Sequence, residues 1–173
     1  MPAKPSKKPT RPISYGNFTP AFIDDLARRL KGKRVLEVYA GNGYLASLLR
    51  SRGVDMVATT LFSGHDGHEQ GMLSEVINMN VVEAVATLGG DFDILLVSWP
   101  TTSEELLKAT RLWGAKPIVF IGEVYNHDLL HGGYAGCASD AFFLAVDTLE
   151  NIESYEPRNR LEKACVFRLR DKP

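Results

Sequence analysis

The chain has 173 residues, of which 45% are hydrophobic and 24% charged, with a net charge of −1 at pH 7. This composition is typical of one globular domain and excludes a disordered chain, a collagen-like fibre and a disulfide-stapled miniprotein. No apolar run approaches the roughly 20 residues of a membrane-spanning helix, so no membrane partner is expected, and the start lacks the apolar core of a secretory signal. The two cysteines, Cys137 and Cys165, indicate reduced, buried thiols in a cytoplasmic protein rather than a disulfide framework or a zinc site.

Residues 1–13 form a proline- and lysine-rich segment that we expect to be a disordered tail, because it cannot bury enough apolar surface to order itself. Its four basic residues give the first dozen positions a charge of +4, which leaves −5 for the rest of the chain. The tail suits contact with nucleic acid or another polyanion, but the acidic body does not favour a dedicated nucleic-acid-binding protein. Residues 14–173 are expected to form the folded domain.

The first half of this domain shows helix and strand patterns in alternation. Thr19 suits a helix N-cap and Pro20 the first helical position, and the apolar residues that follow recur at helical spacing. In chain order we expect a helix over residues 20–30, a strand over 34–38, a glycine turn over 39–43, a helix ending near residue 52, a strand over 55–60 and a polar loop over 61–70.

The second half continues the alternation. Around Val76 and Ile77 the pattern fits a short strand or a short helix equally well. The other elements that we expect are a helix from Val81, a strand over residues 93–98, a helix capped by Ser103 and ending at Trp113, a strand over 117–121, a helix capped by Ser139 or Asp140 and running through Leu149, and two closing strands around 152–155 and 164–169.

Strands that are apolar throughout and alternate with helices indicate a parallel sheet covered on both faces. The short turn between the last two strands indicates that they pair antiparallel. The predicted fold class is therefore α/β: a single Rossmann-like domain with a mostly parallel sheet of six or seven strands, helices on both faces and a C-terminal antiparallel hairpin.

The segment VLEVYAGNGYLA (residues 35–46) is the most informative one. Gly41 and Gly43 allow a sharp turn and a close approach of the backbone to a ligand. The helix that follows directs its N-terminal N–H groups to the same place, and the carboxyl ends of parallel strands are where α/β sheets bind ligands. We therefore predict a ligand site at this turn.

Two classes of ligand compete for this site. The pattern Gly41-x-Gly43-x-x-Ala46 fits the dinucleotide fingerprint, but Thr60 stands where that fingerprint expects an acidic residue. Glu37 would crowd a pyrophosphate, whereas its carboxylate suits a ligand with a cationic amine and a sulfonium. A nicotinamide-dependent oxidoreductase is therefore disfavoured.

From Glu37 to Gly43 the sequence resembles the first motif of the class I S-adenosylmethionine-dependent methyltransferases, an acidic residue followed by x-x-x-Gly-x-Gly. The order of elements extends this resemblance from about residue 14 to residue 169. The resemblance implies S-adenosylmethionine as cofactor. It also implies that the methionine part of the cofactor is surrounded by Glu37, Tyr39, Gly41, Asn42 and Gly43.

The chain departs from the family at the ribose site. The family usually ends its second strand with an acidic residue that binds both ribose hydroxyls, and Thr60 offers only a neutral hydroxyl there. Asp66 or Glu69 in the following loop is a possible substitute. For the adenine amine the resemblance implies Asn78 or Asn80, and Asn80 fits the spacing better.

On the acceptor side, Ser98-Trp99-Pro100-Thr101 is a degenerate relative of the Asn/Asp-Pro-Pro-aromatic motif of many amine and amide methyltransferases. The resemblance implies that Ser98 and Trp99 face the acceptor, although Trp99 also suits simple packing at the edge of the pocket. Glu123, at the end of the fifth strand, is the candidate general base, with an ordinary solvated or capping role as the alternative.

All four histidines lie in predicted loops, at positions 65, 68, 127 and 131. Neither pair is clearly on a helix, so no metal site is predicted. The long, glycine-rich residues 123–136 suit a substrate lid as well as a plain connection.

The expected function is methyl transfer from S-adenosylmethionine to an unidentified acceptor with a nitrogen or oxygen nucleophile. The alternative is a non-catalytic module that keeps the fold, binds the cofactor weakly or not at all, and acts as a subunit or scaffold. Thr60 and the altered motif from Ser98 to Pro100 favour this alternative, and turnover distinguishes the two.

Overall fold

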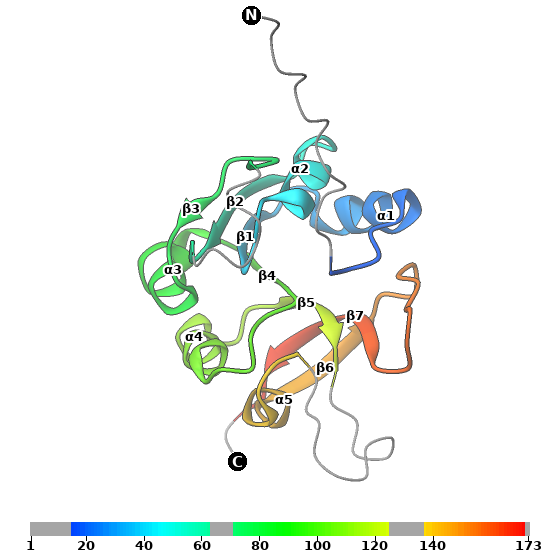
Figure 1. The fold of residues 1–173 in the computed structure, drawn as a ribbon. Helices are drawn as coiled ribbons and strands as arrows, with labels where there is room; N and C mark the ends of the chain where they lie inside the picture. The colour runs from blue at the N-terminus through cyan, green and yellow to red at the C-terminus, as the bar shows by residue number, and fades with distance from the viewer. Residues whose placement is uncertain (1–14, 63–70, 125–136, 172–173) are drawn as a thin grey trace, which may run out of the picture.

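The structure is a computed structural model that describes residues 15–62, 71–124 and 137–171 (Figure 1). In these residues a central sheet is covered by helices on both faces. The elements are α1 (Pro20–Leu30), β1 (Arg34–Val38), α2 (Tyr44–Arg50), β2 (Asp55–Thr60), β3 (Ile77–Asn78), α3 (Val81–Leu88), the short 3-10 helix η2 (Gly89–Asp91), β4 (Ile94–Ser98), α4 (Glu105–Trp113), β5 (Ile118–Glu123), α5 (Asp140–Ala145), β6 (Val146–Asn151) and β7 (Glu162–Leu169).

The described strands form one seven-stranded sheet in the order β3-β2-β1-β4-β5-β7-β6. The first five strands in this order are parallel, and β7 pairs antiparallel with both β5 and β6. The predicted fold class is confirmed, including the closing antiparallel hairpin. In the pairing of β1 with β4, Val38 lies opposite Val97, so these two central strands end side by side at the carboxyl edge.

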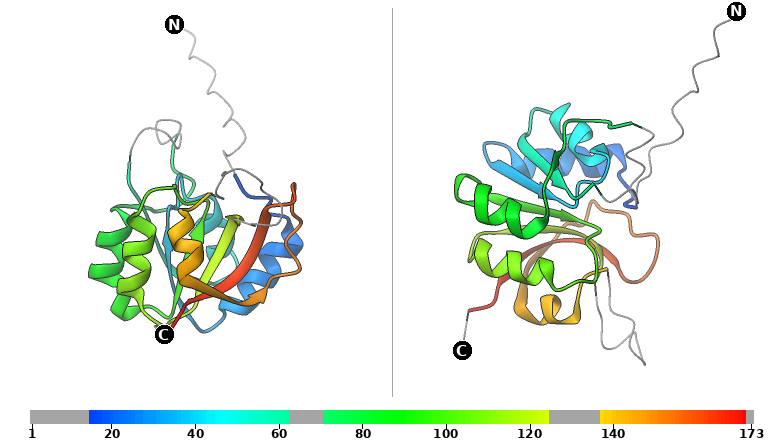
Figure 2. Two further views of the ribbon diagram at one scale, coloured as in Figure 1. Left: turned by 90° about the horizontal axis from the view of Figure 1, so that it is seen from below. Right: turned by 60° about the vertical axis from the view of Figure 1, so that its left-hand side comes forward.

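Two helical layers bury the sheet (Figure 2). Leu36 and Val38 belong to the core cluster that includes residues of α3, α4 and α5. Val35 belongs to the other cluster, with residues of α1 and α2. Because side chains alternate along a strand, Glu37 points to the same face as Val35, beneath α1 and α2.

Helix α1 shows how sequence signals set an element. The Thr19 hydroxyl accepts a hydrogen bond from the Phe22 N–H at 3.2 Å, and Pro20 occupies the first turn. The side chains of Phe22 and Leu26 are fully buried against the sheet.

Among the helices of the described residues, none has the length and the apolar character that crossing a membrane requires.

The prediction of a helix through Leu149 is wrong, as is the prediction of a strand around residues 152–155. Helix α5, capped by Ser139, one of the two predicted caps, ends at Ala145, and the chain continues as strand β6. Pairing of five β6 residues with β7 outweighs the helical spacing of the apolar residues. Leu149 is consequently half exposed on this edge strand.

A smaller correction concerns α4. The N-cap position is Glu104, one residue after the predicted Ser103. The Ser103 hydroxyl nevertheless accepts a hydrogen bond from the Glu105 N–H, at 3.4 Å.

The two cysteines are free thiols, Cys165 buried and Cys137 half-buried, and burial raises the pKa of each to about 12.

Candidate functional site

A cavity of about 110 Å³ opens at the carboxyl edge of the sheet, at the ends of β1 and β4. Four parts of the chain enclose it: the segment before α1, the end of β1 with the turn into α2, the end of β2, and the end of β4 with the residues after it. Its lining consists of Tyr15, Gly16, Phe18, Glu37, Tyr39, Ala40, Gly41, Asn42, Tyr44, Leu45, Thr60, Ser98, Trp99 and Thr101. We call this the first cavity.

A second cavity, of about 280 Å³, lies beside the first on the side of α3 and α4. Its lining consists of Tyr39, Thr60, Leu61, Met79, Asn80, Val81, Thr101, Ser103 and Glu105. Tyr39, Thr60 and Thr101 line both cavities, so the two adjoin across the ends of β1 and β2. Together the two adjoining cavities are the candidate site for an elongated ligand.

Glu37 is the most unusual group in the first cavity. It is only 1% exposed, and its Oε2 atom has no hydrogen-bond partner among the described residues. Burial raises the pKa of Glu37 to about 8, against a smaller opposing effect of Arg50. A buried carboxyl group without a partner costs free energy, so this position is suited to a ligand that brings a cation or a hydrogen-bond donor.

Two further buried polar atoms of this cavity lack a partner among the described residues, the Tyr39 hydroxyl and Trp99 Nε1. Burial raises the pKa of Tyr39 to about 12, and the nearby Thr101 side chain offsets part of that rise. Native proteins leave few such groups unpaired. Their concentration in one cavity together with Glu37 is what a binding site for a polar ligand requires.

The turn after β1 holds the predicted glycines in different environments. Gly41 has a φ of 57° and lines the first cavity. Gly43, with a φ of 83°, is the N-cap of α2, and a Cβ there would lie 2.9 Å from Val76 Cγ2. Gly41 thus allows close approach from the cavity, whereas Gly43 allows close packing of the turn against the residues before β3.

Most of the predicted cofactor residues come together. Glu37, Tyr39, Gly41 and Asn42 line the first cavity, and Thr60 lines both cavities. Gly43 is absent from the described lining of either cavity.

Asn80 lies in the second cavity but has a structural task as well. Its Oδ1 accepts a hydrogen bond from the Glu83 N–H at 2.9 Å, which caps α3. Asn78, the other residue considered for adenine, directs its Oδ1 to the Phe62 N–H at 3.0 Å.

The predicted acceptor-side residues separate into two groups. Ser98, the last residue of β4, and Trp99 line the first cavity. Glu123 ends β5 and lies outside the described lining of both cavities. Its Oε1 accepts a hydrogen bond from Asn159 Nδ2 at 3.1 Å.

Sequence reasoning missed the aromatic residues that close the first cavity. The rings of Tyr15 and Trp99 lie 6.4 Å apart, and those of Phe18 and Tyr44 lie 6.0 Å apart. The signal was present, because Tyr15 and Phe18 stand just ahead of the helix cap Thr19, in a segment that is otherwise poor in apolar residues.

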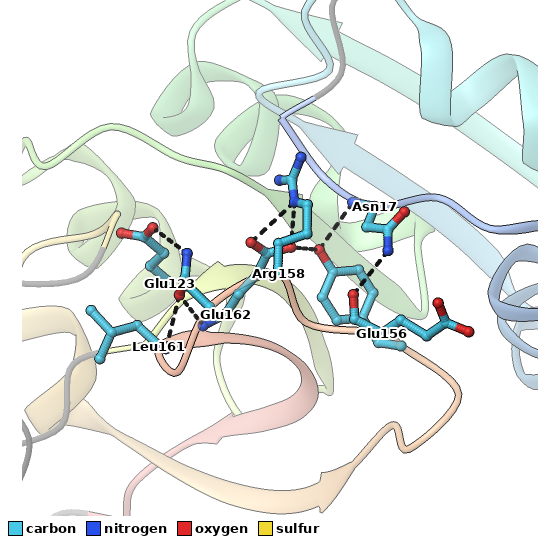
Figure 3. Close-up of polar contacts among 8 residues, drawn as sticks. Asn17, Glu123, Glu156, Arg158, Leu161 and Glu162 are labelled. Atoms are coloured by element: carbon cyan, nitrogen blue, oxygen red, sulfur yellow. Dashed lines mark hydrogen bonds and ion pairs between the residues drawn. The ribbon is translucent and has the colours of Figure 1, made fainter.

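Sequence reasoning also missed a polar network beside the site (Figure 3). The Tyr155 hydroxyl donates to the Glu162 carboxylate, which also accepts from Arg158 Nε at 3.1 Å. Asn17 donates its N–H to the Tyr155 hydroxyl at 3.1 Å and its side-chain amide to the Glu156 carbonyl at 3.0 Å. The network thereby fastens the segment before α1 to the loop between β6 and β7.

Several predicted features lie outside the described residues. These are the basic tail over residues 1–13, the four histidines, Asp66, Glu69, and most of the predicted lid over residues 123–136.

No family model matches the sequence, and no curated protein matches it either. Solved structures do match by fold. A mutant of MtNAS in complex with S-adenosylmethionine matches with a TM-score of 0.57 and 14% identity, over 87% of this chain and 62% of that chain. A putative methyltransferase, yhhF from Escherichia coli, matches with a TM-score of 0.51 and 16% identity, over 89% of both chains.

A putative Zn-dependent alcohol dehydrogenase from Rhodobacter sphaeroides also matches, with a TM-score of 0.55 and 13% identity, over 90% of this chain and 92% of that chain. Identities this low show the fold alone. The chain spans only about 62% of the MtNAS chain. The fold is the Rossmann-like α/β fold that these proteins share, as the sequence predicted.

Proposed function

We propose that this protein binds S-adenosylmethionine across the two cavities and transfers its methyl group to an acceptor with a nitrogen or oxygen nucleophile. The observation that carries the proposal is the buried carboxyl group of Glu37, whose Oε2 has no partner among the described residues, in a cavity lined by Gly41. The structure of the MtNAS mutant supports it, because that protein of similar fold is in complex with S-adenosylmethionine.

The residues present fit the methionine part of this cofactor. Glu37 binds the cationic amine and thereby gains the partner that its Oε2 lacks. At neutral pH the Glu37 carboxyl holds a proton, because burial raises its pKa to about 8. An ammonium group beside it stabilises the carboxylate, so Glu37 releases that proton as the ligand enters.

The second cavity suits the nucleoside part. Thr60 lines both cavities and presents its hydroxyl to the ribose. Asn80 Oδ1 already accepts one hydrogen bond from the backbone of α3 and keeps a second lone pair for the adenine amine. A pyrophosphate, in contrast, would meet the Glu37 carboxyl, which disfavours a nicotinamide dinucleotide.

On the acceptor side the site has to position the nucleophile and exclude water; activation of the nucleophile is less important. S-adenosylmethionine, when bound, supplies a methyl group on a positively charged sulfur. Ser98 and Trp99 orient the nucleophile at the cavity mouth, where proximity and alignment supply most of the acceleration. Glu123, the base expected from the sequence, lies outside the described lining of both cavities and is held by Asn159, so we assign it no proton transfer.

A second candidate function is a non-catalytic module with weak cofactor binding. It is favoured by Thr60, which is 5% exposed and offers the ribose no charged partner. A turnover assay separates the two functions. Incubation with methyl-labelled S-adenosylmethionine and pools of amines, phenols and carboxylates should give a labelled product with the native protein and none with Glu37→Gln. Binding of the cofactor without any labelled product would favour the module.

A further inference from the structure

Arg158, in the loop between β6 and β7, lies next to a residue that lines the first cavity. Its guanidinium carbon is 6.0 Å from the centre of the Trp99 ring, and Trp99 lines the cavity. The Tyr15 ring is 6.4 Å from the same Trp99 ring. A cation and two aromatic rings therefore meet at the acceptor end of the site.

A buried carboxylate fixes the orientation of Arg158. Glu162 is 2% exposed and accepts hydrogen bonds from Arg158 Nε at 3.1 Å on one oxygen and 3.3 Å on the other. The Tyr155 hydroxyl, which donates to the same carboxylate, holds Glu162 in turn. In Figure 3 the Nε side of the Arg158 guanidinium faces Glu162, and the terminal nitrogen atoms lie on the side away from it.

Arg158 and Trp99 both carry donors without a partner in the part of the chain that the structure describes. Neither terminal nitrogen of Arg158 has a hydrogen bond to another described residue, and the Arg158 side chain is 47% exposed. Trp99 Nε1 is a buried donor without a partner among the described residues. A planar pair of guanidinium N–H groups is complementary to a carboxylate or phosphate group, and the indole N–H of the neighbouring ring is a further donor.

We infer that the methyl acceptor is a small planar molecule with a carboxylate or phosphate group, which Arg158 binds while Tyr15 and Trp99 contact the ring. The role of the bound molecule as methyl acceptor rests on the proposed function. The anion site itself does not. Glu162 is a positioning residue for Arg158.

The test uses the two tryptophans of the chain as reporters. Their indole N–H signals are followed by NMR, with Trp99 assigned from its loss in Trp99→Phe. The probes are matched pairs: 4-hydroxybenzoate with 4-hydroxybenzamide, and phenyl phosphate with phenol. At low millimolar concentration the anionic member should shift the Trp99 signal and bind at least about tenfold more tightly than its neutral partner. The Trp113 signal should stay in place, because its Nε1 is bonded to the Lys116 carbonyl at 3.0 Å.

Arg158→Gln should abolish the preference for the anionic probes. Arg160→Gln is the matched control, because Arg160 is exposed in the same loop and lines a separate hollow. Equal binding of charged and neutral probes, an unchanged preference in Arg158→Gln, or no shift of Trp99 with either anion would overturn the inference.

A parallel calorimetric titration with S-adenosylhomocysteine separates this inference from the proposed function. Binding of S-adenosylhomocysteine without an anion preference removes the inference alone. An anion preference that depends on Arg158, without binding of S-adenosylhomocysteine, removes the proposed function and leaves the anion site.

Discussion

Tyr39 and Trp99 are the first residues after two neighbouring parallel strands, β1 and β4, and both have a left-handed backbone, with φ of 57° and 49°. For a residue other than glycine this conformation costs roughly 1–2 kcal/mol. Both side chains also bury a polar atom that has no partner among the described residues. Strain and unpaired polar atoms thus coincide at one cavity, which is the pattern of a site shaped for a ligand rather than for stability.

Glu37 should make the stability of the protein depend on pH. Its pKa is about 8 in the folded protein, against 4.5 for an ordinary glutamate. Between these values the folded state binds more protons than the unfolded chain, so the free energy of unfolding should fall as the pH rises through this window. In Glu37→Gln this slope should largely disappear, and the variant should be a few kcal/mol more stable than the native protein above pH 8. Urea unfolding at a series of pH values measures both effects, and a native protein with no slope in this window would contradict them.

Tyr39→Phe should stabilise the ligand-free protein by about 1 kcal/mol, because it removes a buried hydroxyl without a hydrogen bond and keeps the ring. The same change should weaken the binding of S-adenosylhomocysteine, since the hydroxyl lies where both cavities meet. Thermal unfolding and calorimetry on one preparation check the two directions. A less stable variant would mean that the hydroxyl has a partner in the folded protein.

Gly41→Val should abolish binding of S-adenosylhomocysteine and leave the fold in place, because its side chain would enter the first cavity. The backbone strain of valine at positive φ is controlled by Gly32→Val. Gly32 has a φ of 75° with nothing within 4 Å of a Cβ, and lies outside the lining of both cavities. Gly32→Val should bind normally, at a similar cost in stability. Equal affinities of the two variants would remove Gly41 from the site.

Thr60→Asp should tighten the binding of adenosine, which carries the ribose but no methionine part. A carboxylate would give the ribose hydroxyls charge-assisted hydrogen bonds in place of neutral ones, with a gain of about tenfold in affinity. Thr60→Val, which has a similar shape without the hydroxyl, is the control and should bind more weakly than the native protein. If the aspartate variant binds adenosine no better, Thr60 does not face the ribose.

The sequence predicted the sheet well where its signals are local. The strands predicted over residues 34–38 and 55–60 correspond to β1 and β2 with the same bounds. It failed at β6, because residues 146–151 have helical apolar spacing and become a strand only through pairing with β7. No local pattern contains that pairing.

In the candidate site, too, the sequence predicted the residues of a local motif and missed those that only the fold brings together. Glu37 and Gly41 were predicted because they stand in one short motif, and both line the first cavity. Arg158 was missed because its contact with Trp99 joins distant parts of the chain. The unpartnered state of Glu37 Oε2 is likewise a result of three-dimensional packing, which composition and spacing do not reveal.

The most direct test of the account is calorimetric titration of the protein with S-adenosylmethionine and S-adenosylhomocysteine, with NAD as control, at pH 7 in two buffers of different ionisation enthalpy. We predict micromolar binding of the two sulfur ligands alone, with release of nearly one proton per ligand, because the Glu37 pKa of about 8 must fall when an ammonium group binds beside it. Glu37→Gln should bind more weakly and release no proton. Binding of NAD alone, or silence with all three ligands, would contradict the account.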